Sequence, residues 1–261
     1  MEVACIQMAV VEGDKAATLD KALAMLRQAR GADLMVLPEI WNLGFMSFDR
    51  YREEAEDPDG PTLSALRDAA RELKAHIHSG SFVERRGQAL YNSSYLISPQ
   101  GELLANYRKI HLFGYGSRET ELLTPGRELV VLDTALGRVG MATCYDLRFP
   151  ELFRRMVEAG AELFIVCAAW PYPRLEHWLL LNRVRALENQ CFLVAANSCG
   201  QNQGGMFVGH SLVADPWGIP LACAGDDETV LSARLDLDQV EEARRRFPAL
   251  ADRRDWLQAP A

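Results

Sequence analysis

Short apolar runs alternate with amphipathic stretches along most of the chain. Four runs are continuous in apolar or small residues and too short for helices, which predicts strands at 3–9, 34–37, 163–168 and 192–198. Three stretches repeat apolar residues at helical spacing, which predicts helices at 14–30, 62–73 and 175–189. This alternation predicts an α/β protein.

The other segments are typical of strands joined by turns. Three strands are predicted in succession at 76–84, 90–98 and 103–108, and three more near the end at 209–214, 221–223 and 229–235. A polar helix is expected from Asp236. Hairpins mixed with strand–helix units indicate two sheets packed on each other between helices. With no repeat or Ser/Gly linker in the sequence, we expect a single domain over 1–261.

Charge and cysteine usage narrow the classes of function. The net charge is -8 and there is no basic stripe, which argues against a nucleic-acid partner. No apolar stretch reaches membrane-spanning length. The six cysteines include no C-x-x-C pair, so no metal site is predicted. Free thiols and an N-terminus that begins as a strand, with no apolar leader, predict a cytoplasmic protein.

Cys144 lies where a predicted strand meets a predicted helix. The strand occupies 139–143, and the helix begins at Pro150 and ends before Gly160. A thiol on such a turn is exposed at the sheet edge and lies near backbone N–H groups, which favour its thiolate. This placement predicts a nucleophile, as on the nucleophile elbow of other hydrolases. The alternative is a small buried apolar residue, as most free cysteines are.

Charged residues follow two other predicted strands. Glu39 comes directly after the strand at 34–37, and Lys109 ends the strand that begins at 103. Glu119 lies in the loop beyond. Strand ends at one edge of an α/β sheet are where ligands usually bind. Taken singly, each residue also has a structural explanation, as an ion pair, a solvated lysine or a surface carboxylate.

Together, Leu37-Pro38-Glu39 and the segments 107–113 and 144–152 resemble the three signature blocks of the nitrilase (carbon–nitrogen hydrolase) superfamily in order and spacing. The likeness extends from the first strand to Asp215-Pro216-Trp217-Gly218. The resemblance implies a four-layer αββα sandwich, a hydrolase with a Glu-Lys-Cys triad, and no cofactor or metal. It also implies a homodimer formed through helices next to the active site.

The triad that the resemblance implies is chemically sufficient for amide hydrolysis. Glu39 takes the proton of Cys144 as the sulfur attacks the amide carbonyl. Lys109 and the backbone N–H of Tyr145 stabilise the oxyanion. Glu39 then protonates the departing ammonia, and water hydrolyses the thioester. Glu119 matches the family's second glutamate, which positions the lysine and the substrate.

The sequence leaves two points open around this triad. The loop at 114–117 is shorter than in the wider family, which bears on the placement of Glu119. A rival mechanism pairs Cys144 with His111 or His210. His111 follows the lysine block almost directly, and we expect it to be a structural hydrogen-bond partner instead.

The segment 169–174, with His177-Trp178 beyond it, resembles the corresponding loop of the omega-amidase subgroup, which hydrolyses the ω-amides of 2-oxo dicarboxylic acids. Such a substrate needs a cation for its far carboxylate, and Arg174 or Arg148 can supply it. Arg148 can alternatively pair with Glu151 as a structural ion pair. The candidate pocket residues are Trp170, Trp41, Tyr145 and His177. The three aromatic residues Trp170, Trp41 and Tyr145 could instead fill the core.

Several functions remain open at this point. Within the family, the alternatives are an amidase for deaminated glutathione, an N-carbamoyl amine hydrolase and, less favoured, a true nitrilase. A different class is an inactive homologue that serves as a scaffold. The joint presence of Glu39, Lys109, Glu119 and Cys144 argues against a scaffold, which has no chemical need of all four.

Overall fold

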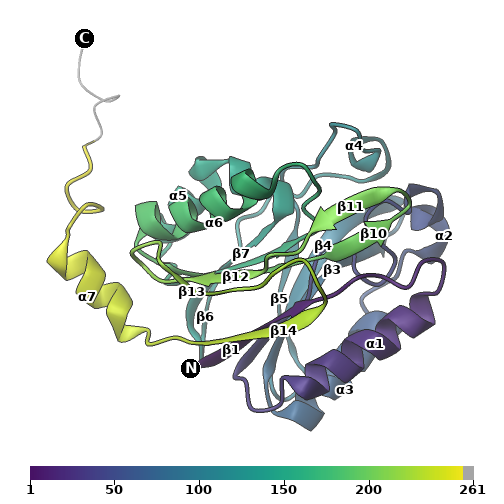
Figure 1. Cartoon of the computed structure of the whole chain (residues 1–261), viewed down its shortest axis with the longest axis horizontal. Helices are drawn as coiled ribbons and strands as arrows, with labels where there is room; N and C mark the ends of the chain where they lie inside the picture. The colour runs from purple at the N-terminus through teal and green to yellow at the C-terminus, as the bar shows by residue number, and fades with distance from the viewer. Residues whose placement is uncertain (255–261) are drawn as a thin grey trace.

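Two six-stranded β-sheets lie face to face in the computed structural model, which describes residues 1–254 (Figure 1). The first sheet has the order β14 (Thr229–Arg234), β1 (Glu2–Gln7), β2 (Leu34–Val36), β3 (His76–Arg86), β4 (Ala89–Ile97), β5 (Leu103–Arg108). The second has the order β13 (Pro220–Cys223), β12 (Leu212–Ala214), β9 (Phe192–Asn197), β8 (Leu163–Ala168), β7 (Gly137–Thr143), β6 (Val131–Thr134).

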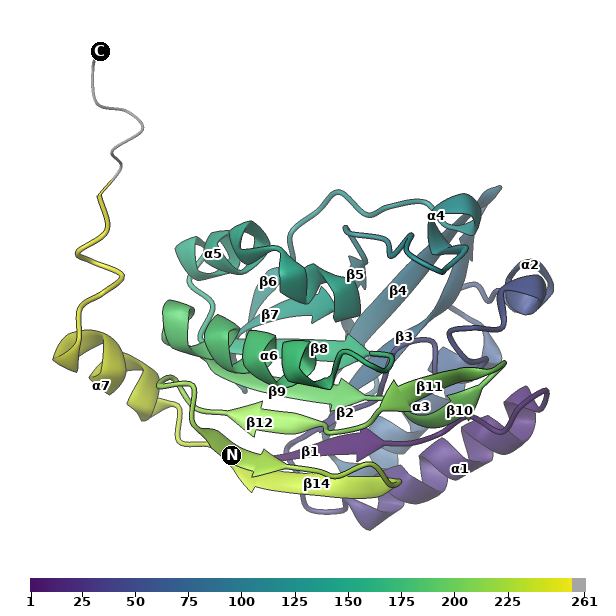
Figure 2. The same ribbon diagram turned by 45° about the horizontal axis from the view of Figure 1, so that its top comes forward.

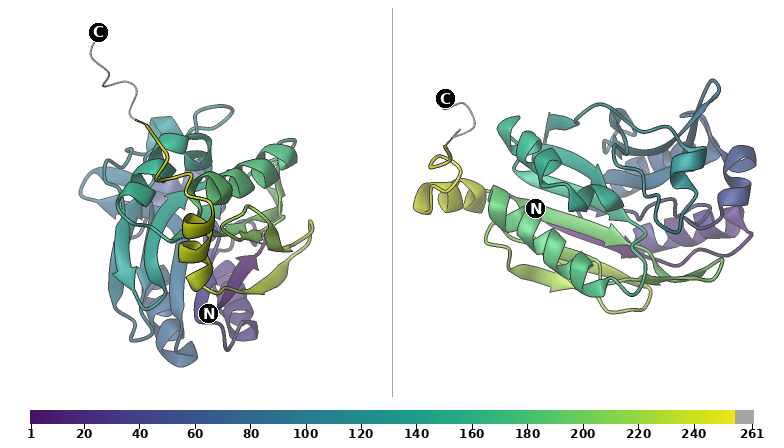
Figure 3. Two further views of the ribbon diagram at one scale, coloured as in Figure 1. Left: turned by 90° about the vertical axis from the view of Figure 1, so that its left-hand side faces the viewer. Right: turned by 90° about the horizontal axis from the view of Figure 1, so that it is seen from above.

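Helices cover the outer face of each sheet (Figures 1 and 3). Helices α1 (Lys15–Gln28) and α3 (Pro61–Leu73) pack on the first sheet, and α5 (Pro150–Glu158) and α6 (Leu175–Asn189) on the second. The apolar strands serve two cores at once, because their side chains alternate between faces. In β8, for example, Ile165 joins the core between the sheets, while Phe164 packs under the helices. The expected four-layer αββα fold is confirmed.

The boundaries agree closely with the sequence-based expectations where the pattern is regular. The strand at 163–168 and the helix at 175–189 have the predicted bounds. The strand expected at 209–214 is shorter, because Gly209 and His210 both have positive φ and break the extended backbone. The polar helix expected from Asp236 is α7 (Asp238–Arg246), which extends beyond the sheets (Figure 2).

The elements that sequence reasoning missed are short. They are β6, the ribbon of β10 (Cys199–Asn202) and β11 (Gly205–Val208), the helical turns α2 (Tyr51–Glu54) and α4 (Glu119–Leu122), and the 3-10 turns η1 (Phe48–Arg50) and η2 (Cys144–Arg148). Several of them, namely α2, α4 and the ribbon of β10 and β11, lie near one end of the sandwich (Figures 1 and 2). Within residues 1–254, no helix has the length and apolar character needed to cross a bilayer.

Strands from both sheets end at this same place. Strands β1, β2 and β3 are parallel to one another, as are β7, β8 and β9. The turn after β2 meets the end of β8 directly, since the N–H of Glu39 donates to the carbonyl of Ala168 at 3.2 Å. The fold therefore brings the residues that follow β2, β7 and β8 together.

Candidate active site

Cys144 occupies the sharp turn between β7 and η2. Its φ of +47° is uncommon for a residue with a side chain and marks local backbone strain. The turn is fixed by Asp146, whose carboxylate accepts from the N–H of Thr143 at 2.9 Å and the hydroxyl of Tyr107 at 2.7 Å. The geometry is that of an elbow which presents a side chain at the end of a sheet.

A buried cluster of charge lies beside this thiol. The ammonium of Lys109 contacts Glu39 Oε1 at 2.7 Å and Glu119 Oε2 at 2.9 Å, and the side chains of all three residues are excluded from solvent. Glu119 opens the short helix α4, and its carboxylate also accepts from the N–H of Phe113 at 2.6 Å. The short loop at 114–117 thus still allows Glu119 to reach Lys109.

The cluster shifts the pKa values of its members. Burial alone lowers the pKa of Lys109, but the carboxylates of Glu119 and Glu39 outweigh burial and raise it well above its usual value. Burial, opposed by Lys109, leaves the pKa of Glu119 raised. The cation is therefore fixed, and Glu119 binds a proton more readily than an ordinary glutamate does.

The pKa of Cys144 differs from the sequence-based expectation. Burial, and after it the nearby charge of Glu39, raise this pKa well above its usual value, although Lys109 opposes them. The expected free thiolate is therefore wrong for the resting site. The thiol has to lose its proton during attack, and Glu39 is the neighbouring carboxylate that can accept it.

His111 has a structural role, as expected. Its Nδ1 lies 2.7 Å from Asp146 Oδ1, and its ring stacks on Phe149 with centroids 3.7 Å apart. The imidazole of His111 therefore stabilises the turn at Cys144 through Asp146 and Phe149. His210, the other candidate for a cysteine–histidine dyad, directs Nδ1 to the carbonyl of Val208 at 2.8 Å.

Cys144 opens into a narrow cavity of about 20 Å³ that continues outward. Its walls include Phe45, Phe113, Tyr145, Arg148, Ala169, Trp170, Pro171 and Arg174. A wider hollow of about 440 Å³ shares Phe45, Phe113, Pro171 and Arg174 with it and is lined further out by Tyr115, Tyr172 and Met206. Arg174 thus lies at the junction of an inner and an outer space.

The remaining candidate contacts divide into two groups. Arg148 lies over the ring of Trp170 at 4.9 Å, and both line the inner cavity. The alternative of a pair with Glu151 is wrong, since within residues 1–254 Arg148 contacts His177 instead, at 3.2 Å. His177 itself is exposed and does not line the cavity.

Trp41 is a correction to the candidate pocket residues. It is fully buried in the core under α1 and α3, and its indole N–H donates to the carbonyl of Ser79 at 2.8 Å. A residue two positions after a catalytic-type carboxylate was expected to share its pocket. The turn after β2 directs the two side chains to different sides, so Trp41 fills the core.

Asn92 is the polar residue of this site that sequence reasoning missed. It lies on β4, is buried, and donates to Glu39 at 2.8 Å and Glu119 at 2.7 Å. The available signal was the polar run 92–94 inside an otherwise apolar strand, because a buried amide needs partners.

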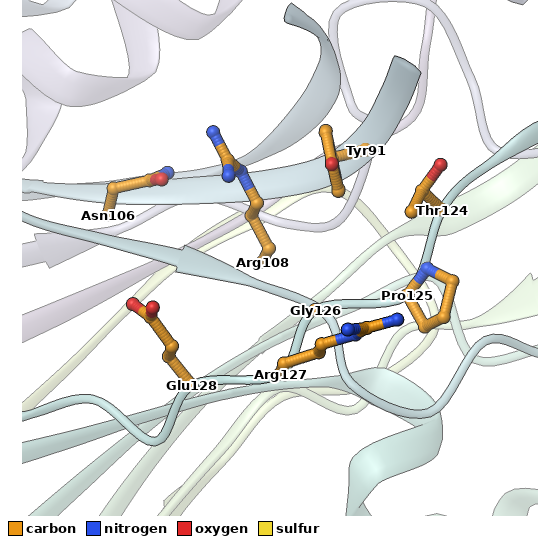
Figure 4. A pocket seen from close by; sticks show the side chains of 8 residues that line it. All are labelled: Tyr91, Asn106, Arg108, Thr124, Pro125, Gly126, Arg127 and Glu128. Carbon is orange, nitrogen blue, oxygen red and sulfur yellow. The ribbon is translucent and has the colours of Figure 1, made fainter.

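A separate hollow of about 340 Å³ lies on the other side of β5 (Figure 4). Arg108 lines it together with Tyr91 and Thr124, whereas the next residue, Lys109, points into the charged cluster. Successive side chains of an extended chain point to opposite faces, which separates the two spaces. The charged cluster of Glu39, Lys109 and Glu119 therefore lies outside this hollow and beside Cys144.

The family model described as carbon-nitrogen hydrolase matches residues 2–245. The chain belongs to the carbon-nitrogen hydrolase family. It is an enzyme of the nitrilase superfamily, and the expectation of an amidohydrolase is confirmed.

Two curated relatives are 2-oxoglutaramate amidases. The one from Paenarthrobacter nicotinovorans is 41% identical over 85% of this chain and 79% of its own length. The one from Bacillus subtilis (strain 168) is 35% identical over 98% of each chain. Among solved structures, Nit3 of Saccharomyces cerevisiae, a member of branch 10 of the nitrilase superfamily, superimposes with a TM-score of 0.90 at 32% identity, covering 97% of this chain and 96% of that one.

Proposed function

We propose that this enzyme hydrolyses the ω-amide of a short 2-oxo dicarboxylic acid and releases ammonia. The observation that carries the chemistry is the buried Lys109 between Glu39 and Glu119, next to Cys144 on its elbow. The substrate class is supported by relatives that are 2-oxoglutaramate amidases and by two arginines in the cavity at Cys144.

The proposed reaction uses the cluster twice. Glu39 takes the thiol proton as the sulfur of Cys144 bonds to the amide carbon, and the carbonyl π electrons move onto oxygen. Lys109 and the free N–H of Tyr145, in the first turn of η2, stabilise that oxyanion. Its collapse expels the nitrogen, which takes the proton from Glu39 and leaves as ammonia. Water then attacks the thioester, and Glu39 transfers the water proton to the sulfur.

We propose Arg174 as the residue that binds the far carboxylate of the substrate, and the size of the cavity supports this role. The inner cavity of about 20 Å³ has room for about one water molecule, so a dicarboxylic monoamide must extend into the outer hollow. Arg174 lines both spaces and stacks on the rings of Phe113 and Tyr115, at 6.0 and 5.4 Å. Within residues 1–254 no carboxylate pairs with it, so its charge is available to an anionic ligand.

Ammonia release from a panel of amides tests the substrate class. We expect kcat/KM for 2-oxoglutaramate to exceed that for deaminated glutathione, an N-carbamoyl amine and a nitrile. Replacing Arg174 by alanine should raise KM for 2-oxoglutaramate about ten- to a hundredfold and change kcat little. A contact remote from the broken bond stabilises substrate and transition state alike.

The controls separate charge recognition from general damage. Arg174→Ala should barely alter KM for an uncharged amide of similar size. Arg245→Ala, at an exposed position on α7, should leave KM unchanged for both the charged and the uncharged amide. A preference for deaminated glutathione or the carbamoyl compound would contradict the substrate class and leave the amidase chemistry intact. Equal effects of Arg174→Ala on charged and uncharged amides would contradict the role of Arg174.

We also propose that the enzyme is a homodimer joined through α6. Leu180 and Leu187, two turns apart on the same face of this helix, are 59% and 49% exposed, and large apolar side chains exposed on one face favour a surface that a partner covers. Leu187→Lys should therefore convert a dimer to a monomer in light scattering coupled to size exclusion. Asp20→Lys, on α1 in the opposite helix layer, should leave the mass unchanged. A monomeric unaltered enzyme would refute this proposal.

A cytoplasmic location remains part of the proposal. Its support is that the six cysteines are all free thiols. Unpaired cysteines in this number are typical of a reducing compartment.

A further inference from the structure

Asn92 joins the two carboxylates of the cluster, as the lysine does. Its Nδ2 donates to Glu39 Oε1 at 2.8 Å and to Glu119 Oε1 at 2.7 Å, so both amide hydrogens are used on carboxylates. Lys109 contacts the same two carboxylates. The ammonium and the amide therefore hold Glu39 and Glu119 in a closed ring of hydrogen bonds.

This ring makes the two oxygens of Glu39 unequal. Oε1 accepts from Lys109 at 2.7 Å and from Asn92 at 2.8 Å. Oε2 accepts from the N–H of Ala169 at 2.9 Å, and no other donor to it is found within residues 1–254. An oxygen that accepts two hydrogen bonds, one from a cation, binds a further proton less readily than its partner.

The less occupied oxygen shares a backbone donor with the thiol. The N–H of Ala169, which bonds Glu39 Oε2, interacts with Cys144 as well. The ring of hydrogen bonds therefore occupies Oε1 and leaves Oε2, the oxygen bonded to Ala169, as the better acceptor for the thiol proton.

We propose that Asn92 is a positioning residue that directs Oε2 of Glu39 at Cys144 and holds Glu119 in place beside Lys109. The inference rests on the amidase chemistry proposed above. The proton of the Cys144 thiol passes to Oε2 as the sulfur–carbon bond forms, and the carbonyl π electrons become the oxyanion. Asn92 touches neither sulfur nor substrate in this step.

The balance of charge in the cluster makes the contribution of Asn92 measurable. Within residues 1–254 the titratable groups that interact with this cluster are Lys109, Cys144, Cys167 and Tyr51, and of these only the lysine is a cation. Burial raises the pKa of Glu119, and the hydrogen bond from Asn92 opposes that rise. Without Asn92 the pKa of Glu119 rises further, and Oε1 of Glu39 loses one of its two donors, which weakens the hold on the carboxylate that accepts the thiol proton.

Asn92→Ala tests the proposal with a readout that needs no knowledge of the substrate. Alkylation of Cys144 by iodoacetamide, followed by mass spectrometry across about pH 5 to 9, reports transfer of its proton directly. We expect alkylation of Cys144 to slow about 100-fold at neutral pH, and the acidic limb of its pH profile to move to higher pH. With 2-oxoglutaramate, kcat should fall similarly while KM stays close to that of the unaltered enzyme.

The matched control is Ser94→Ala. Ser94 is buried two residues further along β4, and its hydroxyl has no hydrogen-bond partner within residues 1–254. This variant should retain the alkylation rate and the pH profile. Thermal unfolding of both variants separates loss of positioning from loss of fold.

Asn92→Asp keeps the size of the side chain but places a third carboxylate against the other two. It should slow alkylation more than Asn92→Ala does, because like charges then repel within a buried site. Alkylation of either folded variant at the control rate, with an unmoved acidic limb, would overturn the proposal. Slowed alkylation in an enzyme that hydrolyses none of the panel would uphold the positioning role and refute the proposed substrate.

Discussion

Replacing Cys144 by alanine is expected to abolish ammonia release from every amide that the enzyme hydrolyses. The proposed reaction passes through a thioester on this sulfur, so no partial route remains when the sulfur is removed. Loss of a nucleophile typically costs about 10⁶-fold in kcat. Because the thiol is buried and small, the variant should keep its fold, which circular dichroism and thermal unfolding can verify.

Alkylation by iodoacetamide provides the complementary measurement. Cys144 should be labelled fastest among the thiols at neutral pH, in parallel with loss of activity. The comparison thiols are Cys223, which is exposed, and Cys199, whose pKa burial raises to about 12. Cys223→Ala should remain active and be inactivated at the same rate. Faster labelling of Cys199 or Cys223 with activity retained would overturn the assignment of the nucleophile.

The expected speed of labelling at Cys144 has a different cause from the one that the sequence indicated. Residues 139–150 show a strand, a turn and a helix start, and those features favour a thiolate. They do not show that Glu39, which follows β2 in the other sheet, places a carboxylate beside the sulfur. The reactivity of this thiol depends on transfer of its proton during the reaction, since its pKa is raised in the resting site.

The strand ends were predictable because the spacing of apolar residues and the turn-forming residues after them define where each strand stops. The runs before Glu39 and Cys144 are short, apolar and followed by a polar or turn-forming residue, so their carboxyl ends could be located from sequence. Strand ends from two different sheets meet through the contact between Glu39 and Ala168, which is a feature of the tertiary structure. Only the resemblance of the three blocks to a known family implied it.

Side-chain direction after an irregular turn could not be predicted. Trp41 follows Glu39 by two residues, yet one fills the core and the other joins the charged cluster. Ile40, between them, has a positive φ, which breaks the alternation that applies inside a strand. Asn92 was missed for the opposite reason. It obeys the alternation of β4, but its partners come from distant segments.

The second large effect is expected at the two charged members of the triad. Glu39→Gln keeps the size of the side chain and removes the base, and Lys109→Ala removes the cation that faces the oxyanion. Each should lower kcat/KM by about 10³-fold or more for any amide that the enzyme hydrolyses. Glu39→Gln should also remove the preferential alkylation of Cys144.

Lys109→Ala carries a cost in stability as well, because Glu39 and Glu119 are fully buried and lose the only cation that pairs with them within residues 1–254. Breaking such a buried group by removing one partner costs about 3–5 kcal/mol of the free energy of unfolding. The double variant Lys109→Ala/Glu119→Gln removes one of the two stranded carboxylates, so it should recover part of the unfolding free energy and none of the activity. Recovery of activity in the double variant would show that Lys109 acts only through stability.

His111→Ala separates this triad from a cysteine–histidine dyad. The imidazole is bonded to Asp146 and stacked on Phe149, so its loss should loosen the elbow and lower kcat far less than Glu39→Gln does. We would compare kcat/KM on one amide for Glu39→Gln, Lys109→Ala and His111→Ala, after thermal unfolding has shown that each variant is folded. A mild effect of Glu39→Gln beside a severe one of His111→Ala would decide for the dyad outright, because no carboxylate base is then needed to remove the thiol proton.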